Sequence, residues 1–214
     1  MTLNNMIDHT NLNPAATEDD LRKLCSEAVQ YGFHSVAINP CWTRLAAREL
    51  AGTDVVVDPC IGFPLGAGTT EAKVEETKIA VADGANEIDM VLNIGHLRMG
   101  DDEYVIKDIA AVVEAAKGRP VKVILECCLL TDDQIVSGCK DSVAAGAAFV
   151  KTSTGFSKGG ATVEDVKLMR KTVGDSCKIK AAGGIHTRED AMAMINAGAD
   201  RIGASSGIAI VSVG

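Results

Sequence analysis

Aromatic residues are scarce in this sequence. Phe, Tyr and Trp together make up 3% of its 214 residues, which leaves few flat side chains on which nucleic-acid bases can stack. The formal net charge is −8, and an excess of acidic groups repels a phosphate backbone. We therefore expect no nucleic-acid partner.

Long apolar runs are missing as well. No stretch approaches the ~20 apolar residues that a membrane-spanning helix needs, and the opening MTLNNMIDHTNLN lacks the basic start and apolar core of a secretory signal. The seven cysteines are an odd number without C-x-x-C spacing, which argues against a disulfide scaffold and against a zinc ribbon. These absences predict a cytoplasmic protein that does not contact a membrane.

Metal-binding patterns are not found either. The four histidines do not cluster, and neither H-x-E nor H-E-x-x-H occurs. We expect a site without a metal and a protein without a cofactor.

Short apolar or β-branched runs alternate with amphipathic stretches along the whole chain. The strand-like runs lie at 6–10, 35–39, 55–63, 87–93, 121–126, 149–153, 178–183 and 201–205. The helical candidates lie at 17–32, 41–51, 69–84, 102–117, 131–146, 162–173 and 187–198. Several of the strand-like runs are apolar on both faces, which is typical of a parallel sheet covered by helices.

Helix boundaries are marked by specific residues. Thr17 with Asp20 three positions on resembles a capping box. Three helical candidates end in a glycine that leads directly into the next strand, namely Gly84, Gly146 and Gly198.

This alternation predicts an α/β protein, a single-domain (β/α)8 TIM barrel over residues 1–214 with a short N-terminal segment and a minimal C-terminal end. A doubly wound open sheet is the alternative. In its dinucleotide-binding form it carries a glycine fingerprint after the first strand. Neither MIDHTNLNP nor SVAINPCWT has one, so the barrel is favoured.

Two lysines lie in neighbouring predicted strands, where a barrel places its active site at the C-terminal strand ends. Lys151 lies in FVKTSTG and Lys180 in KIKAAGG. Like charges and partial desolvation disfavour the ammonium form, and a neutral lysine attacks a carbonyl carbon to form a Schiff base. The alternative is that each lysine pairs with a carboxylate or extends its ammonium to water.

Asp89, in NEIDMVLN, is expected to point the same way as Glu87 and Val91. A carboxylate between two lysines holds one of them charged, and it relays protons through water. A structural ion pair is the other interpretation, and both can hold at once.

Small residues follow the last three predicted strands. Gly155 comes after the sixth, Gly183 and Gly184 after the seventh, and Ser205 and Ser206 after the eighth. Backbone amides in such turns form anion nests, and barrels often bind phosphate after strands seven and eight. These turns predict a phosphate site. The alternative is that the small residues only allow the chain to turn and bind no ligand.

Five segments together resemble the deoxyribose-phosphate aldolases. They are FVKTSTGF (149–156), IKAAGGI (179–185), NEIDMVLNIG (86–95), VAINPCW (36–42) and IDHTNLNP (7–14), and the resemblance runs nearly end to end. It implies a class I aldolase, a lyase that reversibly cleaves 2-deoxy-D-ribose 5-phosphate to D-glyceraldehyde 3-phosphate and acetaldehyde. It also implies a small phosphosugar as the binding partner and a homodimer or higher oligomer.

The resemblance also implies roles for single residues. Lys151 matches the Schiff-base lysine, Lys180 the second lysine that favours its neutral form, and Asp89 the acid that shuttles protons with a water. Asp8 and Thr154 match polar positions near the substrate hydroxyls and the catalytic lysine, and Cys41 matches a cysteine that an unsaturated aldehyde attacks in some members. The phosphate positions are Gly155, Gly183, Gly184, Ser205 and Ser206.

The sequence departs from the family pattern in two places. Some members have a lysine directly after STG, whereas this chain has Phe156, with Lys158 two residues on. The chain also stops at Gly214, so we expect a missing C-terminal tail to affect substrate affinity.

Three other functions remain as alternatives. They are a non-catalytic phosphosugar-binding barrel, a Schiff-base aldolase with another substrate, and an isomerase using a carboxylate base. The isomerase would not need two lysines at the barrel mouth.

Overall fold

A closed parallel barrel forms the centre of the protein. The computed structural model describes residues 2–212. The strands are β1 (Ile7–Asn11), β2 (Ser35–Ile38), β3 (Val56–Ile61), β4 (Ile88–Val91), β5 (Val121–Ile124), β6 (Phe149–Lys151), β7 (Lys178–Ala182) and β8 (Arg201–Ala204). They pair in chain order, and β8 also pairs in parallel with β1. The predicted (β/α)8 barrel is therefore confirmed, and the open-sheet alternative is wrong.

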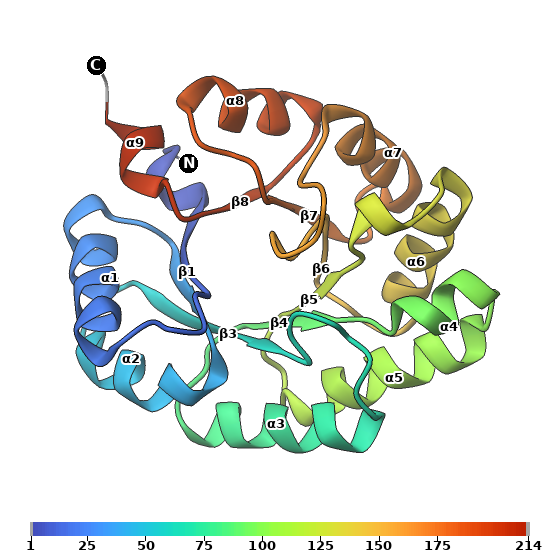
Figure 1. The fold of residues 1–214 in the computed structure, drawn as a ribbon, viewed down its shortest axis with the longest axis horizontal. Helices are drawn as coiled ribbons and strands as arrows, with labels where there is room; N and C mark the ends of the chain where they lie inside the picture. Colours follow the sequence, from blue (N-terminus) through green and yellow to red (C-terminus); the bar gives the residue numbers. More distant parts are fainter. Residues whose placement is uncertain (1, 213–214) are drawn as a thin grey trace.

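Helices surround the barrel as a ring (Figure 1). They are α1 (Glu18–Tyr31), α2 (Thr43–Glu49), α3 (Thr70–Ala82), α4 (Ile94–Met99), α5 (Asp102–Ala115), α6 (Asp132–Ala144), α7 (Val163–Val173), α8 (Arg188–Ala197) and α9 (Gly207–Val211). Short 3-10 turns are η1 (Asn4–Met6), η2 (Pro40–Trp42) and η3 (Cys127–Leu129). Every predicted helix is present, and α4 and α9 are additions too short for their periodicity to be recognised.

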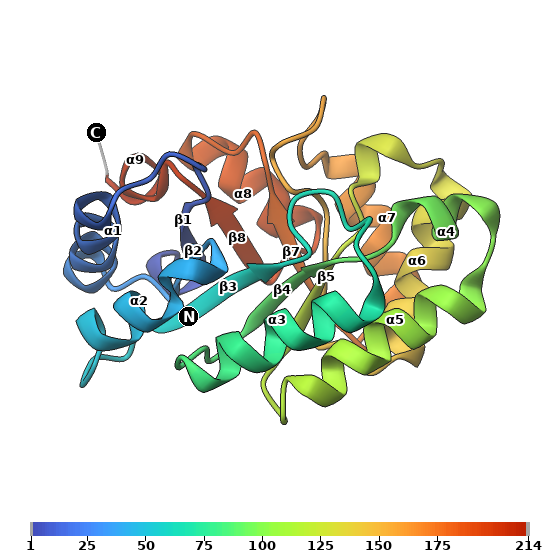
Figure 2. The ribbon, with the colours of Figure 1, turned by 60° about the horizontal axis from the view of Figure 1, so that its bottom comes forward.

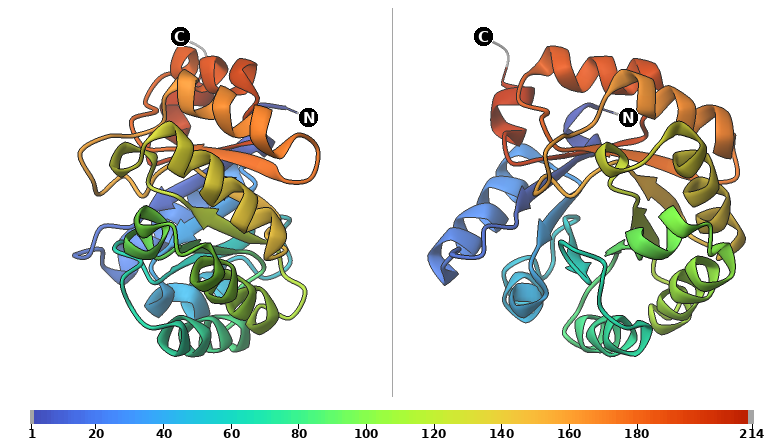
Figure 3. Two further views of the ribbon diagram at one scale, coloured as in Figure 1. Left: turned by 90° about the vertical axis from the view of Figure 1, so that its right-hand side faces the viewer. Right: turned by 45° about the vertical axis from the view of Figure 1, so that its right-hand side comes forward.

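The two ends of the barrel sequence meet in space. α9 lies beside the start of β1 and next to α8 (Figures 1 and 3). α9 has five residues. The last part of the expected minimal C-terminal end, residues 213 and 214, lies outside the described residues.

The predicted helix signals act as expected. The Thr17 hydroxyl accepts a hydrogen bond from the Asp20 amide, and the Asp20 side chain accepts one from the Thr17 amide, so the capping box is complete. Gly84 and Gly198 have φ angles of 107° and 117°, a region that favours glycine and turns the chain into the following strand.

The strands separate an apolar layer from a charged interior. Their outward side chains form one continuous core with the inner faces of the helices, and Figure 2 shows α3 and α5 covering the sheet on one side. Barrel interiors are usually filled by branched apolar side chains. Here several strands instead carry fully buried charged residues, namely Asp8, Asp58, Asp89, Lys122 and Lys180.

Within the described part of the chain, no helix is both long and apolar enough to cross a membrane. All seven cysteines lie in that part, and none is in a disulfide.

A buried ion pair joins α3 to α5 outside the barrel. Lys73 Nζ lies 2.6 Å from Asp108 Oδ2, and both side chains are 1% exposed. The Thr70 hydroxyl donates to the other Asp108 oxygen at 2.8 Å. Asp108 is thus fully partnered only while Lys73 is present.

We predict that Lys73→Met lowers the free energy of unfolding by about 3–5 kcal/mol, because it leaves a buried carboxylate without its cation. Urea unfolding followed by circular dichroism measures the change. The double variant Lys73→Met with Asp108→Leu is the control, and it should recover most of the loss. A double variant as unstable as the single one would contradict this explanation.

Candidate active site

A cavity of about 980 Å³ opens where β6, β7, β8 and β1 end. The predicted site residues that line it are Lys151, Thr154, Gly155, Gly183, Gly184, Ser205 and Ser206. Parallel strands bring these distant segments together, because their carboxyl ends all lie at the same end of the barrel.

Lys151 connects this cavity to the barrel interior. It is the last residue of β6 and lies beside Lys180 of β7 in the strand register. Its side chain is 3% exposed, and its Nζ lies 2.5 Å from Asp89 Oδ2. The amine is therefore held by one carboxylate at the floor of the cavity.

Lys180 shares the same carboxylate oxygen. Its Nζ lies 2.8 Å from Asp89 Oδ2, so one oxygen contacts both lysines and the predicted grouping is present. Burial opposes the charge of Lys180, but Asp58, Asp8 and Asp89 outweigh it, so its pKa lies well above the usual range. Lys180 thus remains a cation directly beside Lys151.

Lys122 of β5 joins Asp89 to two further carboxylates, Asp58 and Glu87. Its Nζ lies 2.7 Å from Asp58 Oδ2, 2.7 Å from Glu87 Oε2 and 2.9 Å from Asp89 Oδ1. Asp89 and Glu87 therefore point into the barrel together, as predicted. Burial opposes the charge of Lys122, but the carboxylates around it raise its pKa well above the usual value.

Arg201 and Asp8 complete the cluster. Arg201 Nη1 lies 2.9 Å from Asp8 Oδ1 and 3.4 Å from Glu87 Oε2. Asp8 Oδ2 lies 2.5 Å from Lys180 Nζ. Burial raises the pKa of Asp8, but Lys180, Lys122 and Arg201 outweigh it and hold the pKa well below the usual range. The predicted substrate contact Asp8 is thus a buried ion partner that does not line the cavity.

The charges of this cluster balance. The carboxylates are Asp8, Asp58, Glu87 and Asp89, and the cations are Lys122, Lys151, Lys180 and Arg201. Buried charges are tolerated when they are paired in this way. We call these residues the barrel cluster.

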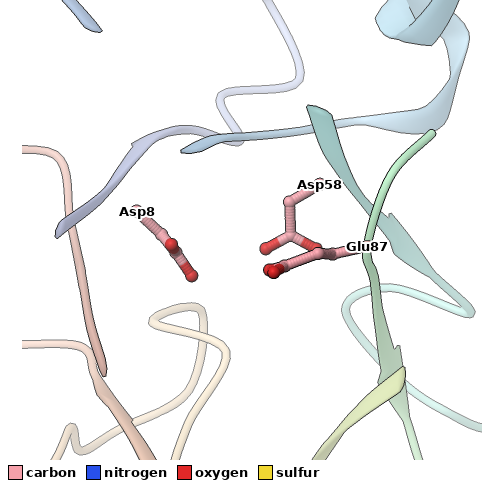
Figure 4. A group of neighbouring side chains, drawn as sticks. All are labelled: Asp8, Asp58 and Glu87. Atoms are coloured by element: carbon pink, nitrogen blue, oxygen red, sulfur yellow. The ribbon is translucent and has the colours of Figure 1, made fainter. Parts of the chain in front are cut away.

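Three of the carboxylates lie close enough together to resemble a metal site. Oxygens of Asp8, Asp58 and Glu87 lie within 4.8 Å of one another, and Figure 4 shows the three side chains close together, Asp8 on β1, Asp58 on β3 and Glu87 just before β4. The Lys122 ammonium contacts the last two, and the Lys180 ammonium contacts the first two. The positive charge that a metal would bring is therefore already provided by side chains.

Glu126 holds the loop that follows Lys151. Its backbone has φ 60° and ψ 59°, a left-handed conformation that is uncommon outside glycine. Its carboxylate accepts hydrogen bonds from the Thr154 amide, at 3.2 Å, and from the Thr154 hydroxyl. This buried side chain fixes Thr154 at the cavity wall, and such strain is often found at functional sites.

Two positions singled out in the sequence lie away from the cavity. Cys41 is exposed in η2, and Lys158 is exposed in the loop after β6; neither lines the cavity. The structure therefore does not bring Cys41 together with the other predicted residues. Phe156 does line the cavity, and its ring contacts Phe63 edge-on with centroids 5.2 Å apart.

The sequence analysis assigned no role in the site to Lys122, Arg201 or Glu126. The signal for Lys122 was the one that identified Lys151 and Lys180, a lysine inside an apolar strand. The role of Glu126 depends on backbone conformation and on a contact across 28 positions, for which the sequence gives no local signal.

Three comparisons relate the chain to known proteins. Residues 2–212 match the model of the DeoC/LacD family aldolases. Deoxyribose-phosphate aldolases from Bacillus cytotoxicus and Clostridium novyi are 61% and 60% identical, covering 99% of this chain and 95% and 96% of theirs. The tetrameric deoxyribose phosphate aldolase from Aeropyrum pernix superposes with a TM-score of 0.91 at 37% identity, covering 97% of this chain and 88% of that one.

Acid should remove the contribution of Glu87 to stability. Burial raises the pKa of Glu87, but the hydrogen bond from His34 and the charge of Lys122 outweigh it and lower the pKa to about 2. A depressed pKa stabilises the folded protein above the unfolded-state pKa, about 4.5, and this contribution disappears as the pH falls toward about 2.

We predict that Glu87→Gln costs about 3 kcal/mol of unfolding free energy at pH 7, and that the difference from wild type shrinks steadily below about pH 4.5. Urea unfolding at a series of pH values measures this. A difference that stays constant with pH would show that Glu87 acts through packing and not through its charge.

Proposed function

Because the chain belongs to the DeoC/LacD family of aldolases, we propose that it reversibly cleaves 2-deoxy-D-ribose 5-phosphate through a Schiff base on Lys151. The products are D-glyceraldehyde 3-phosphate and acetaldehyde. The observation that carries this proposal is the position of Lys151. Of the four cations in the barrel cluster, it is the one that also lines the cavity.

Lys151 has the cation Lys180 beside it and the carboxylate Asp89 in contact with its amine. The persistent positive charge of Lys180, which shares an Asp89 oxygen with Lys151, disfavours a second ammonium beside it. Asp89 is able to accept a proton from Lys151 directly, since the two groups are 2.5 Å apart. Burial raises the pKa of Asp89, but Lys122, Lys151 and Lys180 outweigh it and place the pKa well below the usual range. Asp89 is therefore ionised in the resting site, where it can relay a proton but does not retain one.

The reaction then follows from the electron sink on Lys151. The amine attacks the C1 aldehyde of the open-chain sugar phosphate, and loss of water gives an iminium. A base removes the proton of the C3 hydroxyl, and the C2–C3 bond breaks with its electrons moving into an enamine on Lys151. Asp89 with a water is our candidate for this proton transfer. Protonation of the enamine at C2 and hydrolysis release acetaldehyde.

We assign the phosphate to the turns after β7 and β8, which border the cavity. Gly183 and Gly184 have φ angles of 84° and 74°, and with Ser205 and Ser206 they border the cavity. Consecutive backbone amides in such turns bind anions without a charged side chain. Lys158 is exposed and does not line the cavity, so backbone amides are proposed as the main phosphate contacts.

We also propose a location, an oligomeric state and a domain organisation. The absence of disulfides among the seven cysteines supports a cytoplasmic location. The tetrameric state of the Aeropyrum pernix protein supports a homo-oligomer, to be tested by light scattering. One catalytic domain over residues 1–214 is supported by the barrel closing between its first and last strands.

Lys151→Ala should abolish turnover, because no amine remains to form the imine. Lys180→Leu should lower kcat on the order of 10²- to 10⁴-fold, since the cation that favours a neutral Lys151 is gone. Borohydride reduction with deoxyribose 5-phosphate, followed by mass spectrometry, should locate the adduct on Lys151. Sugar binding without any adduct would support the non-catalytic alternative, and retained turnover in Lys151→Ala would refute the scheme.

Ser206→Pro removes one backbone amide that we assign to the phosphate, so it should raise KM for deoxyribose 5-phosphate about tenfold. KM for unphosphorylated deoxyribose should stay unchanged. Ser206→Ala, which keeps the amide, and Lys158→Ala are matched controls and should both resemble wild type. Steady-state kinetics with the two sugars decides, and an equal KM increase for both would contradict the assignment.

A further inference from the structure

Asp58 is one of five members of the barrel cluster to which the proposed mechanism gives no role. It lies in β3, is 0% exposed, and does not line the cavity. Its Oδ2 lies 2.7 Å from Lys122 Nζ and 3.0 Å from Lys180 Nζ. Its Oδ1 is buried and has no hydrogen-bond partner among residues 2–212.

The other carboxylates of the cluster have a partner at each oxygen. Asp89 has cations at both oxygens, Lys122 at Oδ1 and the two site lysines at Oδ2. Glu87 has His34 at Oε1 and Lys122 at Oε2. Asp8 has a cation within 2.9 Å of each oxygen, although its Oδ2 makes no hydrogen bond with Lys180 or any other residue among 2–212. Asp58 is thus the carboxylate whose ionised form is least satisfied, because an unpaired buried oxygen carries its full desolvation cost.

Charge balance connects this carboxylate to Lys151. The cluster is neutral with four carboxylates and four cations, but an attacking Lys151 must be uncharged. Three cations would then face four carboxylates inside the barrel, and an uncompensated buried charge is strongly unfavourable. One carboxyl group must therefore take up a proton when Lys151 gives one up.

We propose that Asp58 stores the proton that Lys151 loses, and returns it when the iminium forms; this rests on the Schiff-base function proposed above. Asp58 acts through Lys180 and Asp89 and does not touch the substrate, so it is a positioning residue. The protonated carboxyl and the neutral amine together keep the cluster neutral.

The proton balance of imine formation fits this role. An amine, an aldehyde and one proton give an iminium and a water, so the step consumes a proton. The stored proton leaves Asp58 as positive charge appears on the nitrogen of Lys151, and the net charge of the cluster is the same before and after. Lys180 Nζ contacts both Asp58 Oδ2 and Asp89 Oδ2. It can therefore accept a proton from Asp58 while donating one toward Asp89 and the carbinolamine.

The charged groups around Asp58 come from four other strands. They are Asp8 of β1, Glu87 and Asp89 at β4, Lys122 of β5 and Lys180 of β7. Burial and the charge of Asp89 outweigh the two lysines and raise the pKa of Asp58 to about 6. Loss of the Lys151 charge raises this pKa further, which favours the stored proton near neutral pH.

The test measures how imine formation depends on pH. Wild type and Asp58→Asn are equilibrated with subsaturating acetaldehyde at several pH values, quenched with borohydride, and the modified fraction of Lys151 is read by mass spectrometry. In wild type the equilibrium constant should change less than about twofold between about pH 6 and pH 8, because no proton is exchanged with solvent. In Asp58→Asn it should fall about tenfold per pH unit, since the proton must come from solvent.

Asp141→Asn is the matched control. Asp141 is a buried carboxyl in α6 with an unpartnered Oδ2, and burial followed by the charge of Asp102 raises its pKa to about 6 as well. It lies outside the barrel cluster, so this variant should keep the flat wild-type profile. A flat profile in Asp58→Asn overturns the proposal.

Infrared spectroscopy tests the proposal even if Asp58→Asn does not fold. In the Asp141→Asn background, acetaldehyde should remove the carbonyl band of a protonated carboxyl group as Asp58 ionises. A spectrum without that loss overturns the proposal. These results distinguish failure of the Schiff-base proposal from failure of the Asp58 proposal. If no adduct forms on Lys151 at any pH, the Schiff base itself is refuted. If an adduct forms but the Asp58→Asn profile is flat, only the role of Asp58 is refuted.

Discussion

Eight charged side chains inside one barrel must neutralise each other almost without water, and this constraint shapes the site. Asp8, Asp58, Glu87 and Asp89 face Lys122, Lys151, Lys180 and Arg201 at hydrogen-bonding distances. Removing one partner from such a network is costly because it leaves a buried charge unpaired, whereas a proton that moves within the network leaves its net charge unchanged. The same ion pairs that fill the barrel therefore also make proton transfer possible near Lys151.

Access to the cavity divides the cluster into two parts. Lys151 lines the cavity, whereas Lys122 and Lys180 are fully buried. In the proposed mechanism, substrate reaches only Lys151, and the buried cations set its electrostatic surroundings. The proposal therefore has one amine act as a nucleophile while chemically identical amines nearby remain charged.

The cavity wall distributes binding and chemistry between different elements. Glycine-containing turns after β6 and β7 and the serines after β8 border one side, where backbone amides suit an anion. Thr154, held by Glu126, lines the same cavity as Lys151. Phe156, whose ring contacts Phe63, gives the cavity an apolar edge, at a position where some family members carry a lysine. Loops can vary in this way without disturbing the barrel that supports them.

The sequence by itself determined the barrel, its strand order and the pair of lysines, because these depend on local patterns. Alternating apolar runs, capping residues such as Thr17, and lysines within strands are all readable without coordinates. The tertiary structure alone decided which charges meet. Lys122 with Asp58, and Arg201 with Asp8, are separated by 64 and 193 positions, and only closure of the barrel brings them together. It also placed Cys41 on the surface and Asp8 in the interior, since the side of a strand or turn that faces the cavity depends on the register of its neighbours.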